Sequence, residues 1–136
     1  MQAVLDPNVV VSAVLSRAGT PAALLRAWLD GAYELIVSPA LLGELERVLG
    51  YPKIASRVSP DEARDLLDVL RLQARIIDDP DNAPSVGSPD PNDDYLICLA
   101  EAAPAVIVSG DSDLLGLTEQ IPVYTPAAFL ALLTQT

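Results

Sequence analysis

The chain has 136 residues, of which 51% are hydrophobic, and it carries a net charge of −11 with no histidine. This length fits a single domain over residues 1–136, and the apolar content excludes a disordered chain. No apolar run approaches the roughly 20 residues that a membrane span needs, so no membrane association is expected. A single cysteine excludes an internal disulfide and, with no signal-like N-terminal segment, favours a cytoplasmic protein.

The charge is divided unevenly along the chain. All eight basic residues lie between positions 17 and 75, whereas residues 76–136 contain ten acidic residues and no basic one. Such a surface repels a phosphate backbone unless metal ions offset it or the basic half makes the contact. Arg17, Arg26 and Arg57 are candidates for that contact, although an arginine on a solvated helix face is the simpler interpretation.

Apolar runs that predict strands alternate with capped segments that predict helices. The run Ala3–Leu5 indicates a buried strand, and Asp6 followed by Pro7 is typical of an N-cap and the first helical residue. In chain order, strands are expected at 3–5, 33–37, 75–78, 105–109 and 123–124. Helices are expected at about 7–18, 20–30, 39–49, 60–74, 92–102, 111–117 and 126–133, with a proline-rich loop at 79–91.

This alternation predicts an α/β fold, a parallel central sheet covered by helices on both faces in three α/β/α layers. The run AVIVS at 105–109 is apolar on both faces, as in a fully covered strand. Ligands bind such sheets at the carboxyl ends of the strands, near a switch in strand order. Asp6 and Asp111 each follow a strand, so they face one cleft if those strands are neighbours.

Five acidic residues at four separated places are candidate ligands for a divalent cation: Asp6, Glu44, Asp93, Asp111 and Asp113. Without histidine, hydrolytic chemistry must use carboxylates, whose oxygens suit Mg²⁺ or Mn²⁺. Two carboxylates about 4 Å apart repel by several kcal/mol at an effective dielectric near 20. One of them takes up a proton unless a cation is present.

Each candidate also has a simpler interpretation. Asp6 is a good N-cap, although its carboxylate has oxygens for both capping and metal binding. Glu44 flanks the apolar stripe of its helix and could instead pair with Arg47 at i,i+3. Asp93 shares a face with the apolar residues of its helix and so points toward the sheet, where an unpaired carboxylate is unfavourable. Asp94 points away, as a charge favoured by the helix dipole.

Two further polar residues lie near these acids. Asn8 suits local hydrogen bonding better than metal binding. Ser109 begins a polar turn, with Asp111 and Asp113, directly after the apolar strand. An ordinary N-cap turn explains one of these aspartates but less readily the pair.

Four segments resemble the PIN-domain family in order and spacing: LDPNVVVSAVL, SPALLGELERVL, DPNDDYLICLA and VIVSGDSDLLGL. The similarity spans essentially the whole chain and is greatest to the small, single-domain, toxin-type (VapC-like) branch. It implies an α/β/α sandwich and a Mg²⁺- or Mn²⁺-dependent ribonuclease. It also implies a homodimer and a cognate antitoxin partner.

The resemblance also assigns roles to individual positions. The catalytic and metal-binding acids are Asp6, Glu44, Asp93 and Asp111, with Asp113 as a further ligand or a neighbour of the ligands, and Asn8 and Ser109 in support. One position departs from the family pattern, because Pro7 stands where Thr or Ser is usual. This removes a hydroxyl and a backbone N–H beside the metal site.

The acidic residues favour a metal-dependent hydrolase, and the resemblance implies an endoribonuclease that acts on RNA as the toxin of a toxin–antitoxin pair. A catalytically degenerate PIN-fold binding module is the main alternative, favoured by Pro7 and by the acidic second half. A phosphoacceptor or phosphatase domain is a weaker alternative. Such domains generally need a lysine near the phosphoryl group, whereas the only lysine here is Lys53, and Asn8 stands where one phosphatase class has its second aspartate.

Overall fold

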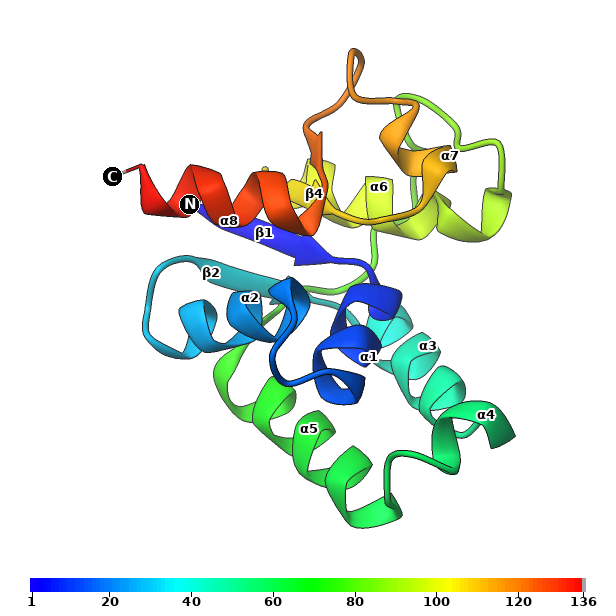
Figure 1. Ribbon diagram of the computed structural model, residues 1–136. Helices are drawn as coiled ribbons and strands as arrows, with labels where there is room; N and C mark the ends of the chain where they lie inside the picture. Colours follow the sequence, from blue (N-terminus) through cyan, green and yellow to red (C-terminus); the bar gives the residue numbers. More distant parts are fainter. Residues whose placement is uncertain (136) are drawn as a thin grey trace.

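The computed structural model describes residues 1–135, which form a five-stranded sheet with helices around it (Figure 1). The strands are β1 (Gln2–Leu5), β2 (Glu34–Val37), β3 (Arg75–Ile76), β4 (Val106–Val108) and β5 (Val123–Tyr124). They are all parallel, in the order β3-β2-β1-β4-β5. The predicted parallel α/β architecture is confirmed.

The helices lie close to the predicted positions. They are α1 (Pro7–Leu15), α2 (Thr20–Leu29), α3 (Pro39–Leu49), α4 (Pro52–Ala55), α5 (Pro60–Gln73), α6 (Asp94–Ala102), α7 (Ser112–Leu115) and α8 (Pro126–Thr134). In Figure 1, α1, α2, α3 and α5 lie on one side of β1, and α6 and α7 lie on the other. Right-handed crossovers explain this division, because the chain moves to one edge of the sheet through β3 and then returns to build the other.

Local sequence signals explain where most helices begin and end. Ser59 and Glu62 form a capping box at α5, in which the Ser59 Oγ accepts from the Glu62 N–H at 3.1 Å and the Glu62 carboxylate accepts from the Ser59 N–H at 3.2 Å. The α2 helix is followed by Gly31, whose φ of +86° favours glycine. These helix ends depend on residues three or four positions apart, so they can be predicted from the sequence.

Several boundaries differ from the prediction, including α1, which ends at Leu15 rather than near residue 18, and α7, which ends at Leu115 rather than at 117. The short helix α4 was not expected, and β3 ends at Ile76 rather than at Asp78. The predicted helix at 92–102 begins as a 3₁₀ turn over Pro91–Asp93, and regular α-helix starts at Asp94. The Asp90 side chain accepts from the Asn92 N–H at 3.0 Å and so caps this tighter first turn.

The two central strands place their carboxyl ends side by side. The β1 and β4 strands pair with Leu5 opposite Val108, so the next residues, Asp6 and Ser109, are neighbours. From β1 the chain crosses to β2 on one side, and from β4 it crosses to β5 on the other. This reversal is the switch point at which parallel sheets bind ligands.

The loop at 79–91 is held at both ends by side-chain hydrogen bonds. The Asp79 carboxylate accepts from the Ala40 N–H at the start of α3 at 2.8 Å. The Asp94 carboxylate at the start of α6 accepts from the Ser88 N–H at 2.8 Å. Asp94 thus has a role beyond the expected helix-dipole charge, because it also ties this loop to α6.

No single helix within residues 1–135 is long and apolar enough to cross a membrane. The α1 and α2 helices reach the length and apolar content of a membrane span only when taken together, and they meet at an angle of 101°.

The last helix completes the core with an aromatic contact. Phe129 in α8 is fully buried, and its ring meets that of Tyr33 edge to face at 5.1 Å between centroids. The Tyr33 hydroxyl donates to the Leu24 carbonyl at 2.8 Å and fixes the ring. Such aromatic pairs contribute beyond the area that they bury.

Replacing Phe129 with alanine is expected to lower the free energy of unfolding by about 3–5 kcal/mol, because it opens a cavity in the core. Urea unfolding followed by circular dichroism measures the change. The control is Leu72→Ala, since Leu72 is 82% exposed and its loss should stay within about 0.5 kcal/mol. Equal effects in the two variants would contradict the buried position of Phe129.

Candidate functional site

Asp6 occupies the carboxyl end of β1 and is held from three directions. Its backbone N–H donates to the Val108 carbonyl on β4 at 2.9 Å. Its carboxylate caps α1 by accepting from the Asn8 N–H at 3.0 Å and also accepts from the Ser109 hydroxyl at 2.8 Å. Asp6 and Ser109 are both buried. Asp6 is therefore an N-cap, as expected, and its orientation is fixed by a residue from the second central strand.

Burial raises the pKa of Asp6. The hydrogen bonds from Asn8 and Ser109 lower this pKa, whereas the negative charges of Asp111 and Glu44 raise it again, and the net shift is upward. The floor of the site is thus a carboxylate that lies in a negative field and has little access to water.

Three aspartates meet above this floor. One carboxylate oxygen from each of Asp93, Asp111 and Asp113 lies within 4.8 Å of the others. Asp111 caps α7 by accepting from the Asp113 N–H at 2.9 Å, and its own N–H donates to the Ser109 hydroxyl at 3.0 Å. Ser109 therefore links Asp6 to the aspartate cluster.

Asp93 has the least favourable surroundings of the group. Its Oδ2 atom is buried and has no hydrogen-bond partner within residues 1–135. Burial, followed by the charges of Asp111, Asp6 and Asp90, raises the pKa of Asp93 to about 7. A buried oxygen without a donor, facing other carboxylates, fits a hard divalent cation, which prefers such ligands. The predicted inward direction of Asp93 is confirmed.

Glu44 faces the same cleft from α3 but is engaged with Arg47. The Arg47 Nε donates to Glu44 Oε2 at 2.9 Å, and a second guanidinium nitrogen contacts Oε1. The i,i+3 pairing weighed from the sequence is therefore present. Neither Glu44 nor Asp6 joins the aspartate cluster in the part of the chain that the structure describes.

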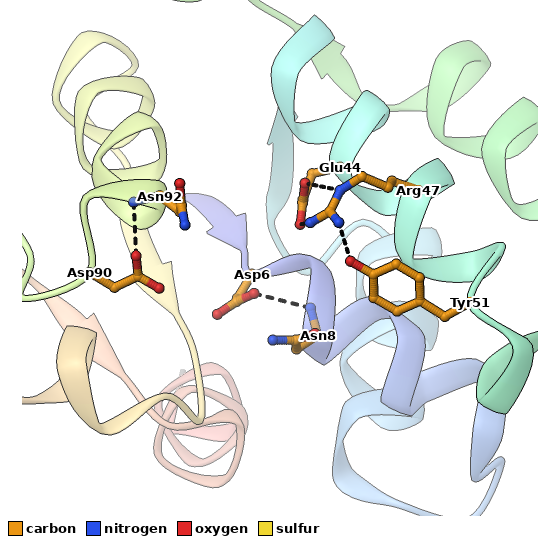
Figure 2. A network of polar contacts seen from close by, with 7 residues as sticks. All are labelled: Asp6, Asn8, Glu44, Arg47, Tyr51, Asp90 and Asn92. Atoms are coloured by element: carbon orange, nitrogen blue, oxygen red, sulfur yellow. Dashed lines mark hydrogen bonds and ion pairs between the residues drawn. The ribbon is translucent and has the colours of Figure 1, made fainter.

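These elements enclose a cleft of about 650 Å³. Figure 2 shows Asp90 and Asn92 on the α6 side, Glu44 and Arg47 on the α3 side, and Asp6 with Asn8 between them. Of the predicted site residues, the lining includes Asp6, Asn8, Glu44, Asp93 and Asp111. Asp113 contributes only to the aspartate cluster.

Sequence reasoning missed four residues that line the cleft: Arg47, Asp90, Asn92 and Tyr95. Asp90 and Asn92 precede Asp93 in a single turn, and this proximity was the available signal. Tyr95 lies two positions after Asp93. Burial, followed by the charge of Asp6, raises the pKa of the Tyr95 hydroxyl. Arg47 was considered only as a partner for Glu44.

The arginines expected near the phosphate lie elsewhere. Arg17, Arg26 and Arg57 are absent from the cleft lining within residues 1–135. Arg26 donates to the Arg17 carbonyl at 3.0 Å, and Arg57 donates to the Leu15 carbonyl at 3.2 Å. These contacts satisfy carbonyls at and beyond the end of α1, the end away from Asp6.

A family model and one solved structure agree with this architecture. A family model described as the PIN domain matches residues 2–113. No curated protein matches the sequence. A chain in the crystal structure of VapBC2 from Rickettsia felis bound to a DNA fragment from their promoter is similar, with a TM-score of 0.60 and 16% identity over 92% of this chain and 98% of that one. A domain of a functionally unknown protein from Methanocaldococcus jannaschii DSM 2661 gives a TM-score of 0.49 and 13% identity, over 91% and 89% of the two chains.

Replacing Ser109 with alanine is expected to destabilise the protein by about 1–3 kcal/mol at pH 7, because the buried Asp6 carboxylate and the Asp111 N–H both lose a partner. Urea unfolding in EDTA measures the change. Ser112→Ala is the matched control, since Ser112 is exposed on α7. A Ser109 variant as stable as this control would contradict the linking role.

The raised pKa of Asp93 predicts that the stability of the metal-free protein depends on pH. Because its pKa is raised to about 7 in the folded chain, above the usual 3.8, the folded state holds this proton more tightly. The resulting stability is present below about pH 4 and is lost as the pH rises to about 7. The stability of Asp93→Asn relative to wild type should therefore increase between pH 4 and pH 7.5. Urea unfolding in EDTA at several pH values tests this, and a difference independent of pH would contradict it.

Proposed function

We propose a function from one premise: this chain belongs to the PIN domain family. The proposed activity is hydrolysis of RNA phosphodiester bonds by a metal-dependent endoribonuclease. The observation that carries the proposal is the buried, partnerless Oδ2 of Asp93 beside Asp111 and Asp113. A cation would satisfy a buried oxygen that faces other carboxylates and has no donor.

In this proposal Asp93, Asp111 and Asp113 would hold the Mg²⁺ or Mn²⁺, and Asp6 and Glu44 would complete the acidic site. An ion held there would supply a water of lowered pKa and a positive charge for in-line displacement at phosphorus. The residues of the chain position the reactants. Asp6 keeps its orientation through Ser109 and Asn8, and one of the carboxylates orients the attacking water.

Pro7 does not disturb the orientation of the Asp6 carboxylate. Pro7 is the first residue of α1, a position at which a backbone N–H has no partner within the helix. The Asp6 carboxylate is oriented by Asn8 and Ser109, and neither contact uses residue 7. The site therefore supports a catalytic enzyme better than a degenerate binding module.

The proposal extends to the biological setting. The likeness to a chain of the VapBC2 complex, together with the family, supports a toxin that a cognate antitoxin protein holds inactive. A homodimer and a cytoplasmic location belong to the same proposal.

The proposed activity is tested by incubating mixed-sequence RNA with the protein and Mn²⁺ or Mg²⁺. Cleavage should require the metal, stop in EDTA and fall at least about 10- to 100-fold in Asp93→Asn, since losing a residue that only supports a metal ligand already costs that much. Asp65→Asn is the matched control, since it makes the same change at an exposed position on α5 and should leave cleavage intact.

A second readout separates metal binding from catalysis. A cation that binds only the folded state raises the melting temperature, and about 100 times its dissociation constant adds about 2.7 kcal/mol. This rise should disappear in Asp93→Asn. Absence of both cleavage and a metal-induced rise in the wild type would contradict the proposal and favour the degenerate module, with Pro7→Thr as the first reversion.

A further inference from the structure

Arg47 is the only basic residue among those that line the acidic cleft within residues 1–135. Its side chain is 58% exposed, and its guanidinium contacts Glu44 on one side. On the other side the guanidinium donates to the Tyr51 hydroxyl and lies over the Tyr51 ring, 5.2 Å from its centroid. Glu44, Arg47 and Tyr51 therefore form a linked row on the α3 side of the site (Figure 2).

Tyr51 is one of the few large hydrophobic side chains of the described chain that remain exposed, at 41%. It follows the end of α3, and Arg47 fixes its ring in place. An aromatic ring that is exposed and held next to an arginine is the arrangement with which proteins bind unpaired nucleotides, because a base stacks on the ring and the guanidinium contacts the phosphate.

The distribution of charge favours entry of the substrate on this side. The opposite wall carries Asp90 and Asp93, and residues 76–136 contain no basic side chain. A polyanion is repelled by that wall and is attracted to the Arg47 side of the cleft. Exposed ion pairs contribute little to stability, so a phosphate can replace Glu44 as the partner of Arg47 at low cost.

We propose that Arg47 and Tyr51 form a nucleotide-binding subsite for single-stranded RNA at the mouth of the cleft. The Tyr51 ring stacks on one unpaired base, and Arg47 contacts the adjacent phosphate. This subsite rests on the proposed ribonuclease function, whose substrate it restricts to unpaired segments. A duplex cannot use it, because its bases already stack on one another.

The subsite is tested by the fluorescence anisotropy of a labelled single-stranded RNA in Mg²⁺, with every protein in the Asp93→Asn background so that the RNA remains intact. Tyr51→Leu should weaken binding by about 5- to 100-fold, which corresponds to the loss of one stacked base. Tyr51→Phe keeps the ring and should retain most of the affinity. Duplex RNA of the same sequence should bind more weakly and should not respond to Tyr51→Leu.

Arg47→Gln should reduce the slope of log affinity against log salt by about 0.7, the value for one phosphate contact on a single strand. Arg64→Gln is the matched control, because Arg64 pairs with Asp61 at i,i+3 on α5 and does not line the cleft. Its slope should match that of the parent. Melting temperatures of all variants verify that each protein is folded.

The outcomes separate the subsite from the nuclease. Unchanged RNA binding in Tyr51→Leu and Arg47→Gln would overturn the subsite, even if wild type cleaves RNA, and would leave this surface to a protein partner. Loss of binding in these variants supports the subsite. If wild type then showed no metal-dependent cleavage, the proposed nuclease activity would fail while the RNA-binding subsite stood.

Discussion

The pairing of β1 with β4 is the constraint on which the site depends. Residues 103 positions apart in the chain become neighbours because Leu5 lies opposite Val108, and the Ser109 hydroxyl then reaches the Asp6 carboxylate at 2.8 Å. The same hydroxyl accepts from the Asp111 N–H. A shift of one residue in this register would turn Ser109 to the other face of the sheet. The Ser109 hydroxyl would then no longer link Asp6 to Asp111.

The fold concentrates charge that it does not neutralise. Asp93, Asp111 and Asp113 are brought together, whereas Arg47, which lines the same cleft, pairs with Glu44. Folding without a counterion therefore acts against electrostatic repulsion, and the apolar core of the central strands must supply the compensating stability. Burial first, and then the charges of Asp111, Asp6 and Asp90, raise the pKa of Asp93 to about 7.

The sequence predicted the sheet, most helices and the inward face of Asp93, because these depend on periodicity and on caps a few residues apart. The capping box of Ser59 and Glu62 is one such local signal. Other features depend on tertiary distances that a sequence does not contain. Arg57 lies at the far end of α1 and Arg47 lines the cleft because of how α3 and α4 pack, and the sequence does not contain this information.

The loop at 79–91 has a mechanical consequence. It is tied to α3 through Asp79 and Ala40 and to α6 through Asp94 and Ser88, and these two helices carry opposite walls of the cleft. Such a brace limits how far the walls can spread. The wall with Glu44 and the wall with Asp93 are therefore linked through one loop, and the cleft has its shape before a ligand arrives.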